Sequence, residues 1–205
     1  MSVLVYIESP KGQIKKTGYE VAFYGSQLAK LMGTDCIGLF VGKTNDPGSV
    51  GRYGINKVIH VNAASEPDFD AQVFAKIIAQ IAGNNGANTI ILSHTSNGKS
   101  LTGRLAIKMN AGSVSGANAL PDVTNGFNVT KSVFSGKAFV KYAISTDNKV
   151  ISVMGNSVQP VESGSNAPVE NSEIAIEPSP LKVLERKTSE GIVPLPEAEL
   201  VVSAG

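Results

Sequence analysis

Short apolar runs alternate with segments of helical periodicity over the first 110 residues. The runs are rich in β-branched residues and predict buried strands over residues 2–7, 36–41, 57–61 and 89–92. Between them, apolar residues recur at three- and four-residue steps, which predicts helices over residues 19–32, 68–81 and 96–109. Alternating strands and helices favour an α/β fold in which helices cover both faces of a parallel sheet.

The ends of these helices follow from the capping residues. We expect the first helix to bury a face that runs from Val21 to Leu31. Asp68 can cap the second helix and complement its dipole, and Ser96 or Asn97 can cap the third. The second and third helices should therefore begin at or next to one of these polar residues.

The pattern changes after about residue 110. Residues 112–119 can hold a short fifth strand, and three closely spaced runs follow at residues 129–134, 137–145 and 149–154. Turn residues separate the three runs, at 135–136 and at 147–148. This arrangement predicts an antiparallel β meander attached to the parallel sheet.

The last fifty residues have the composition of a linker. Residues 155–180 are rich in Gly, Ser, Asn and Pro, and we expect an extended arm there, with edge strands possible at 173–176 and 182–187. The pattern of residues 199–205 predicts the start of another buried strand that is followed by a glycine turn. The predicted organisation is an α/β domain over 1–157, an arm over 158–197, and the first strand of a further domain over 198–205.

Composition excludes several classes of protein. The 205 residues carry a formal net charge of +1 without a block of like charges, which argues against a nucleic-acid surface or an anionic-membrane surface. The single cysteine, Cys36, lies in an apolar run and is expected in the core. The first residues read as a strand and not as a signal peptide, and no apolar run is long enough for a membrane span. We expect a cytoplasmic protein without direct membrane insertion.

The loop after the fourth strand is the first place to look for chemistry, because sites in such sheets lie at the carboxyl ends of strands. Residues 93–100 come within one residue of the phosphate-binding pattern GxxxxGK[ST], with Ser93 in place of the first glycine. One hypothesis is an ATP- or AMP-binding loop that uses Asn97, Gly98, Lys99 and Ser100. The favoured interpretation is that Gly98 permits a tight turn and that Lys99 and Ser100 are ordinary first-turn residues.

Other candidate groups are weaker. His60 and His94 each follow or end a predicted strand, but no Asp, Glu or Cys accompanies them at ligand spacing, so we expect no metal site. Lys99 and Arg104 lie near a helix N-terminus and are candidates to meet an anion. No nucleophile turn of the type GxSxG is present around Val114, and we expect no catalytic residue.

Several of these segments, taken in order, resemble the N-terminal part of the alpha subunit of electron transfer flavoproteins. The resemblance spans nearly the whole chain and rests on the opening strand, two internal motifs, the meander and the final residues. The segments are residues 3–8 (VLVYIE), 53–58 (YGINKV), 97–101 (NGKSL) with 104–106 (RLA), and 201–205 (VVSAG). The family's last motif usually reads Val-Val-Ser-Gly-Gly followed by Arg-Gly, and here Ala204 replaces a glycine and the chain ends before the Arg.

The resemblance implies a fold, a cofactor and partners. It implies a three-layer, Rossmann-like sheet of the adenine nucleotide alpha-hydrolase type, which pairs with a beta subunit. It also implies that the intact protein carries electrons from flavin dehydrogenases to an acceptor, with FAD bound mainly by a further domain. No FAD contact is therefore expected in these 205 residues. A third possibility is a stand-alone relative whose Pro-rich tail wraps its own core.

Overall fold

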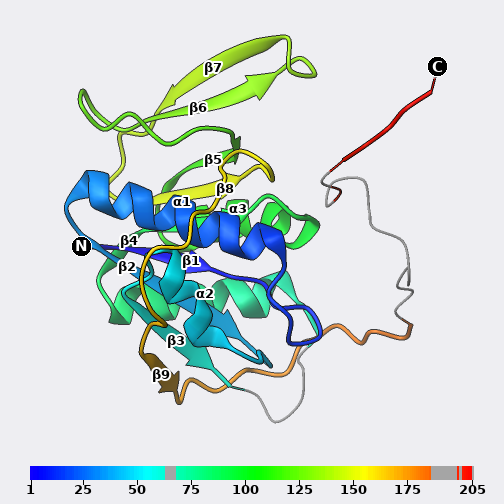
Figure 1. The fold of residues 1–205 in the computed structure, drawn as a ribbon. Helices are drawn as coiled ribbons and strands as arrows, with labels where there is room; N and C mark the ends of the chain where they lie inside the picture. Colours follow the sequence, from blue (N-terminus) through cyan, green and yellow to red (C-terminus); the bar gives the residue numbers. More distant parts are fainter. Residues whose placement is uncertain (63–67, 186–197, 199, 205) are drawn as a thin grey trace.

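A single sheet of nine strands runs through the described part of the chain, which comprises residues 1–62, 68–185, 198 and 200–204 of this computed structural model. The spatial order of the strands is β7-β6-β5-β8-β4-β1-β2-β3-β9 (Figure 1). The strands are β1 (Ser2–Tyr6), β2 (Asp35–Val41), β3 (Lys57–Val61), β4 (Ala87–Ser93), β5 (Gly112–Ala117), β6 (Asn128–Val133), β7 (Ala138–Ala143), β8 (Lys149–Val153) and β9 (Val169–Ser172). Pairing is parallel except at β5–β6 and β6–β7. The predicted α/β fold with a parallel sheet is confirmed.

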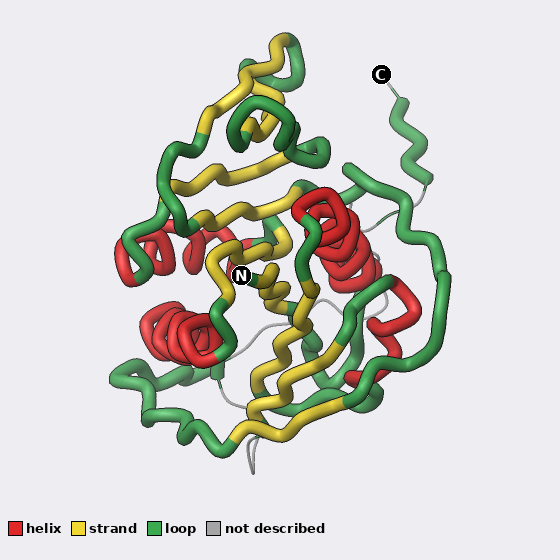
Figure 2. Tube along the Cα trace, turned by 90° about the vertical axis from the view of Figure 1, so that its left-hand side faces the viewer, coloured by secondary structure: helices red, strands yellow, loops and turns green. Residues whose placement is uncertain are grey.

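Helices cover both faces of the sheet (Figure 2). They are α1 (Lys16–Met32), the 3-10 helix η1 (Pro47–Tyr53), α2 (Ala71–Asn84) and α3 (Ser96–Lys108). One apolar cluster joins α1 and η1 to one face, and a second joins α2 and α3 to the other. Successive side chains of β1 enter opposite clusters, as Val3 and Val5 do on one side and Leu4 on the other. This explains why the first strand is continuously apolar. None of the described helices is both long and apolar enough to cross a bilayer.

Three details of the helices differ from the predictions. Leu31 was expected on the buried face of α1, but it is 53% exposed, and Met32 packs on the core in its place, one four-residue step after Leu28. The N-cap of α2 is Asp70 and not Asp68, and its carboxylate accepts a hydrogen bond from the backbone N–H of Gln72 at 2.7 Å. Several polar residues precede α2 and α3, and only the local backbone geometry selects the one that caps.

The N-cap of α3 is Thr95, where Ser96 or Asn97 was expected. Its hydroxyl accepts a hydrogen bond from the backbone N–H of Gly98 at 3.1 Å. The predicted apolar face of this helix is present, with Leu101 and Leu105 fully buried. The whole block 97–100 therefore lies in the first turn of a helix.

The antiparallel meander is present, but it consists of β5, β6 and β7 and not of the three predicted runs at 129–134, 137–145 and 149–154. β6 and β7 pair antiparallel around the turn at residues 134–137, but β8 lies between β5 and β4 and is parallel to both. Residues Val150–Val153 are all buried, as expected for a central strand with layers on both faces, whereas a meander strand with one open face would expose alternate residues. The turn at 147–148 therefore leads into the core of the sheet and not into a second hairpin.

The arm after β8 lies along the body, and Ser179 and Val183 still approach it. Its edge strand is β9, which is parallel to β3 and lies earlier than the predicted edge strand at 173–176. Ala167 packs so closely on η1 that a β-carbon at Gly51 would lie 2.1 Å from its backbone nitrogen. Ile174 and Ile176 then pack against the cluster beneath α2. The arm thus covers the edge of β3 that would otherwise be open.

The remaining predictions concern the end of the chain. The described residues 182–185 and 200–204 form no strand, and residues 186–187, 199 and 205 of the two predicted strands lie outside the described part. The three-part organisation, with boundaries at 157 and 197, stays a prediction.

Candidate functional site

The order in which the chain adds strands to the sheet reverses between β1 and β4. From β1 the chain proceeds to β2 and β3 on one side, and it then returns to form β4 on the other side of β1. In open α/β sheets, ligands bind in the crevice outside the carboxyl ends of the strands at such a point. A cavity of about 710 Å³ lies there. Its walls include Glu8, Lys15, Glu20, Ser93, His94, Asn97, Lys99 and Asn156.

Gly98 brings the first turn of α3 close to the end of β4. A β-carbon at this position would lie 1.8 Å from the carbonyl oxygen of Ser93. The glycine is therefore needed because the two-residue connection between β4 and α3 brings the first turn of the helix directly onto the strand end, which agrees with the expected tight turn. This requirement accounts for the glycine without a phosphate ligand.

The carboxylate of Glu8, two residues beyond β1, lies against the N-terminus of α3. It accepts a hydrogen bond from the hydroxyl of Thr95 and a second from the side-chain amide of Asn97 at 3.1 Å. Burial raises the pKa of Glu8, while these hydrogen bonds and the charge of Lys15 oppose the rise. The N-terminus of a helix is the usual place for a bound anion. Here the carboxylate of Glu8 lies at the N-terminus of α3, where such an anion would bind.

The other candidates of the loop do not converge on one ligand position. Lys99 is exposed and lies on the cavity wall. The hydroxyl of Ser100 donates to the carbonyl of Asn97 at 2.7 Å, as first-turn serines often do. Arg104 is close enough to Asp70, at the start of α2, for its charge to help lower the pKa of that carboxyl, after the larger effect of three hydrogen bonds. Lys99 and Arg104 therefore do not form a joint anion site.

The two histidines are also separate. The Nδ1 atom of His94 lies 2.9 Å from the hydroxyl of Ser152, a fully buried residue of β8 that also accepts a hydrogen bond from the backbone N–H of Gly116. Burial lowers the pKa of His94, and the charges of Lys99 and Lys131 lower it further. His94 thus joins the carboxyl ends of β4, β5 and β8, in surroundings that disfavour its protonated form.

His60 lies three strands away from β4, where its Nε2 atom is 2.7 Å from the carbonyl oxygen of Gly42. In the described ranges, no three His, Cys, Asp or Glu side chains lie close enough together to hold a metal ion. Cys36 is buried in the core, as predicted, and burial raises the pKa of its thiol.

Two carboxylates of this cavity were not predicted. Besides Glu8, the α1 residue Glu20 is almost completely buried, and its carboxylate accepts a hydrogen bond from the backbone N–H of Asn156 at 3.1 Å. A charged residue directly after a buried strand is a signal that points to Glu8. No sequence signal distinguishes Glu20 from a solvated helix residue, because its partner is 136 residues away.

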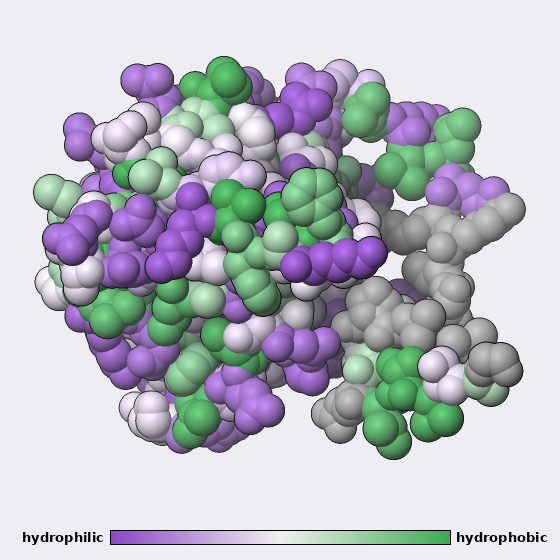
Figure 3. Space-filling view, turned by 90° about the horizontal axis from the view of Figure 1, so that it is seen from above, coloured by the Kyte–Doolittle hydropathy of each residue, from purple (hydrophilic) through white to green (hydrophobic). Residues whose placement is uncertain are grey.

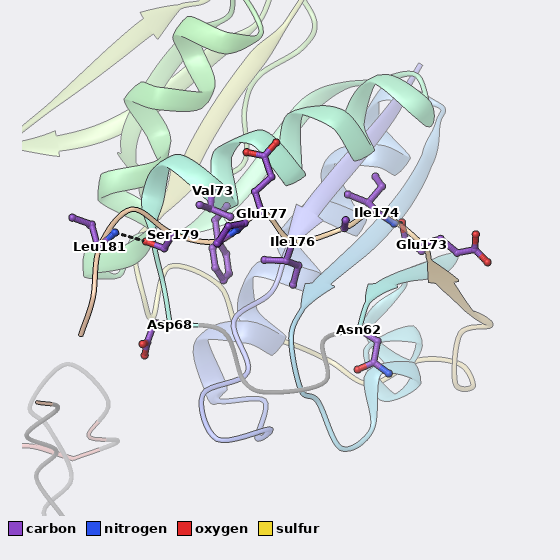
Figure 4. Close-up of a pocket in the computed structure, with 13 residues that line it drawn as sticks. Asn62, Asp68, Val73, Glu173, Ile174, Ile176, Glu177, Ser179 and Leu181 are labelled. Atoms are coloured by element: carbon purple, nitrogen blue, oxygen red, sulfur yellow. Dashed lines mark hydrogen bonds between the residues drawn. The ribbon is translucent and has the colours of Figure 1, made fainter. Parts of the chain in front are cut away.

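A second cavity, of about 620 Å³, lies between the arm and the start of α2 (Figure 4). The side chain of Ser179 donates to the carboxylate of Asp70 at 2.6 Å, and the backbone N–H of Leu181 donates to the hydroxyl of Ser179 at 2.9 Å. Glu173 and Glu177 flank the apolar residues Ile174, Ala175 and Ile176 of the arm along its wall. This cavity is the space left where the extended arm crosses the helix.

An open, mostly parallel sheet with helices on both faces and a cavity at its switch point defines a Rossmann-like α/β domain. The chain belongs to the electron transfer flavoprotein domain family, whose model matches residues 3–177. It is also 25% identical, over 212 aligned residues, to the electron transfer flavoprotein subunit alpha of Bacillus subtilis (strain 168). That alignment covers 99% of this chain and 63% of the relative, so the chain spans less than two thirds of the relative's length. The family resemblance seen in the sequence is confirmed.

Proposed function

We propose that this chain is the N-terminal α/β domain of an electron transfer flavoprotein alpha subunit. In this role it docks a beta subunit and supports the domain that carries FAD. The intact protein transfers electrons from flavin dehydrogenases to an acceptor and is a carrier, not an enzyme. The observation that carries the proposal is the similarity to an alpha subunit over 99% of this chain, together with the family match over residues 3–177.

The geometry of the switch-point cavity supports a platform role. Glu8 lies where the phosphate of a nucleotide would approach α3, and a second carboxylate, that of Glu20, is buried in the same cavity. Two carboxylates make the cavity a poor site for a phosphate. We therefore expect FAD to be held mainly by residues outside these 205, where the cofactor supplies the redox chemistry and the protein supplies binding and electrostatics.

Two measurements test the proposal. The chain co-expressed with a beta subunit from the same source should elute from a sizing column as a one-to-one complex. The chain purified alone, mixed with FAD and then desalted, should retain no visible flavin absorbance. Stoichiometric flavin on the isolated chain, or separate elution of the two polypeptides, would contradict it.

The alternative is an ATP- or AMP-binding domain, and the cavity at the switch point with Lys99 on its wall favours this hypothesis. Calorimetric titration with ATP and magnesium distinguishes the two. Saturable binding that is lost in Lys99→Ala, but kept in Lys108→Ala at the other end of α3, would support a nucleotide site. Glu8→Gln should then strengthen binding, because it removes a negative charge beside the phosphates.

A further inference from the structure

The hairpin formed by β6 and β7 stands away from the rest of the fold (Figure 1). β6 joins β5 through one ladder pair, Ala117 with Lys131, and through a hydrogen bond from the backbone N–H of Asn118 to Thr130. β7 is the last strand of the sheet, so one edge of its backbone lacks a neighbouring strand in the described part of the chain. The hairpin is therefore the most accessible strand edge of this end of the sheet.

Three aromatic side chains of the hairpin face solvent. Phe134 at the tip is 79% exposed, Phe139 on β7 is 69% exposed and Tyr142 on β7 is 44% exposed. Cross-strand pairing puts Tyr142 on the same face as Val129, and Phe139 on the opposite face with Ser132. Both faces of this edge hairpin thus expose an aromatic side chain, and large exposed apolar groups mark an interaction site. Figure 3, which looks down on this end of the molecule, shows hydrophobic side chains beside hydrophilic ones.

The charges of the hairpin have a single sign. Residues 128–143 include Lys131, Lys137 and Lys141 and contain no Asp or Glu. Asp122, outside the hairpin, is close enough to Lys141 for that charge to contribute to the lowering of its pKa, after the hydrogen bonds from Thr124. Phe139 therefore lies among lysines on one face of the hairpin while Tyr142 lies on the other, and a complementary partner needs apolar pockets with carboxylates on their rims.

This chemistry disfavours a second copy of the chain. Pairing two β7 edges would bring the lysines of one hairpin toward those of the other, and like charges across a strand pair are destabilising. Lysine on an edge strand also blocks self-association in natural sheets. Three lysines in a chain of net charge +1 provide too little positive charge to indicate a nucleic-acid-binding surface. A different polypeptide with acidic groups fits best.

We propose that the β6–β7 hairpin is the surface on which the second subunit docks. Phe139, which lies on the same face of the hairpin as Lys137 and Lys141, enters an apolar pocket of the partner with carboxylates on its rim, and Tyr142 contacts the partner on the opposite face. The open edge of β7 gives the partner main-chain groups to pair with. The identity of the partner as the beta subunit rests on the proposed function.

Affinity measurements with the purified beta subunit test this surface. Phe139→Thr/Tyr142→Thr keeps residues that favour strands, and it should weaken binding by roughly tenfold or more. Lys137→Glu/Lys141→Glu should weaken it as well, and the wild-type dissociation constant should rise with salt. The control is Ile107→Gln, at a residue of α3 that is 85% exposed and lies outside the hairpin, and it should change the affinity by less than about twofold. Circular dichroism checks that each variant folds.

Hydrogen exchange gives a readout that needs no variant. The amides of β7 should become protected when the beta subunit is added. Unchanged affinity in both double variants, or unprotected β7 amides in the complex, would overturn the hairpin surface while leaving the proposed function intact. No binding by the wild-type chain would overturn both. Dimerisation of the chain alone that the aromatic variant abolishes, or binding of an oligouridylate, would overturn the chemistry assigned to the partner.

Discussion

Gly98 lies so close to Ser93 that a β-carbon on the glycine would be 1.8 Å from the serine's carbonyl oxygen. This contact connects the first turn of α3 to the end of β4, and it sets the depth at which the helix packs on the sheet. Every group at the switch point that comes from the start of α3, including Thr95, Asn97 and Lys99, depends on it.

Gly98→Ala should therefore destabilise the protein, although alanine is the better helix former. The added methyl group forces the helix or the strand end to move, and we expect a loss of about 2 to 3 kcal/mol in the free energy of unfolding. Gly103→Ala is the matched control in the same helix. No atom lies within 4 Å of its new β-carbon, so it should stabilise by about 0.5 to 1 kcal/mol. Denaturant unfolding measures both, and equal effects would contradict the contact.

Glu8→Gln should change the pH dependence of stability. Burial raises the pKa of Glu8 in the folded state, so the folded protein binds more protons than the unfolded chain just above the ordinary carboxyl value of about 4.3. Wild-type stability therefore falls as pH rises through this window, and the glutamine variant lacks this loss. The free energy of unfolding of the variant minus that of wild type should grow with pH and then level off. A difference that shrinks with rising pH would contradict the assignment.

Lys99→Gln should raise the pKa of His94. Burial is the main cause of the lowered pKa, and the charge of Lys99 is the next. Removing that charge, or screening it with salt, should move the imidazole midpoint in an NMR titration toward the ordinary value of about 6.5. Lys108→Gln, at the far end of α3, should leave it in place. Equal shifts in the two variants would show that Lys99 has no specific effect.

Asp70→Ala and Ser179→Ala should not be additive. Asp70 caps α2 and also holds Ser179 of the arm, at 2.7 Å and 2.6 Å respectively. We expect Asp70→Ala to cost about 1 to 2 kcal/mol and Ser179→Ala about 1 kcal/mol or less. Once either partner is removed, removing the other should cost less, because the shared hydrogen bond is already lost. Chemical denaturation of the two single variants and the double variant gives the coupling energy, and strict additivity would show that the arm is not tied to the cap.

The strands of the N-terminal half and their helices could be predicted because the signal is local. Lys57–Val61 was predicted with its observed bounds, and the apolar face of α3 contains Leu101 and Leu105 as expected. Helix starts were less certain, since several polar residues precede each helix. Whether Asp68 or Asp70 becomes the cap depends on which backbone N–H groups point at the carboxylate.

The position of β8 in the sheet could not be predicted from local patterns. Its residues read correctly as a strand, but the hydrophobic pattern does not tell whether the neighbours are β7, as predicted, or β4 and β5, as found. The answer depends on contacts across some sixty residues, in which Thr89 pairs with Lys149. Only the packing of the complete sheet decides which strands neighbour β8, because β8 is buried on both faces when it lies between β4 and β5.

The sequence by itself determined the α/β class, the family resemblance, the buried Cys36 and the loop at residues 93–100 as the place to look. Tertiary structure decided what that loop does. Glu8 meets Thr95 and Asn97 across 87 and 89 residues, and Glu20 meets Asn156 across 136. Such meetings depend on strand order and on the depth at which each helix packs, and these are set by the burial of the entire core and not by any short stretch of the chain.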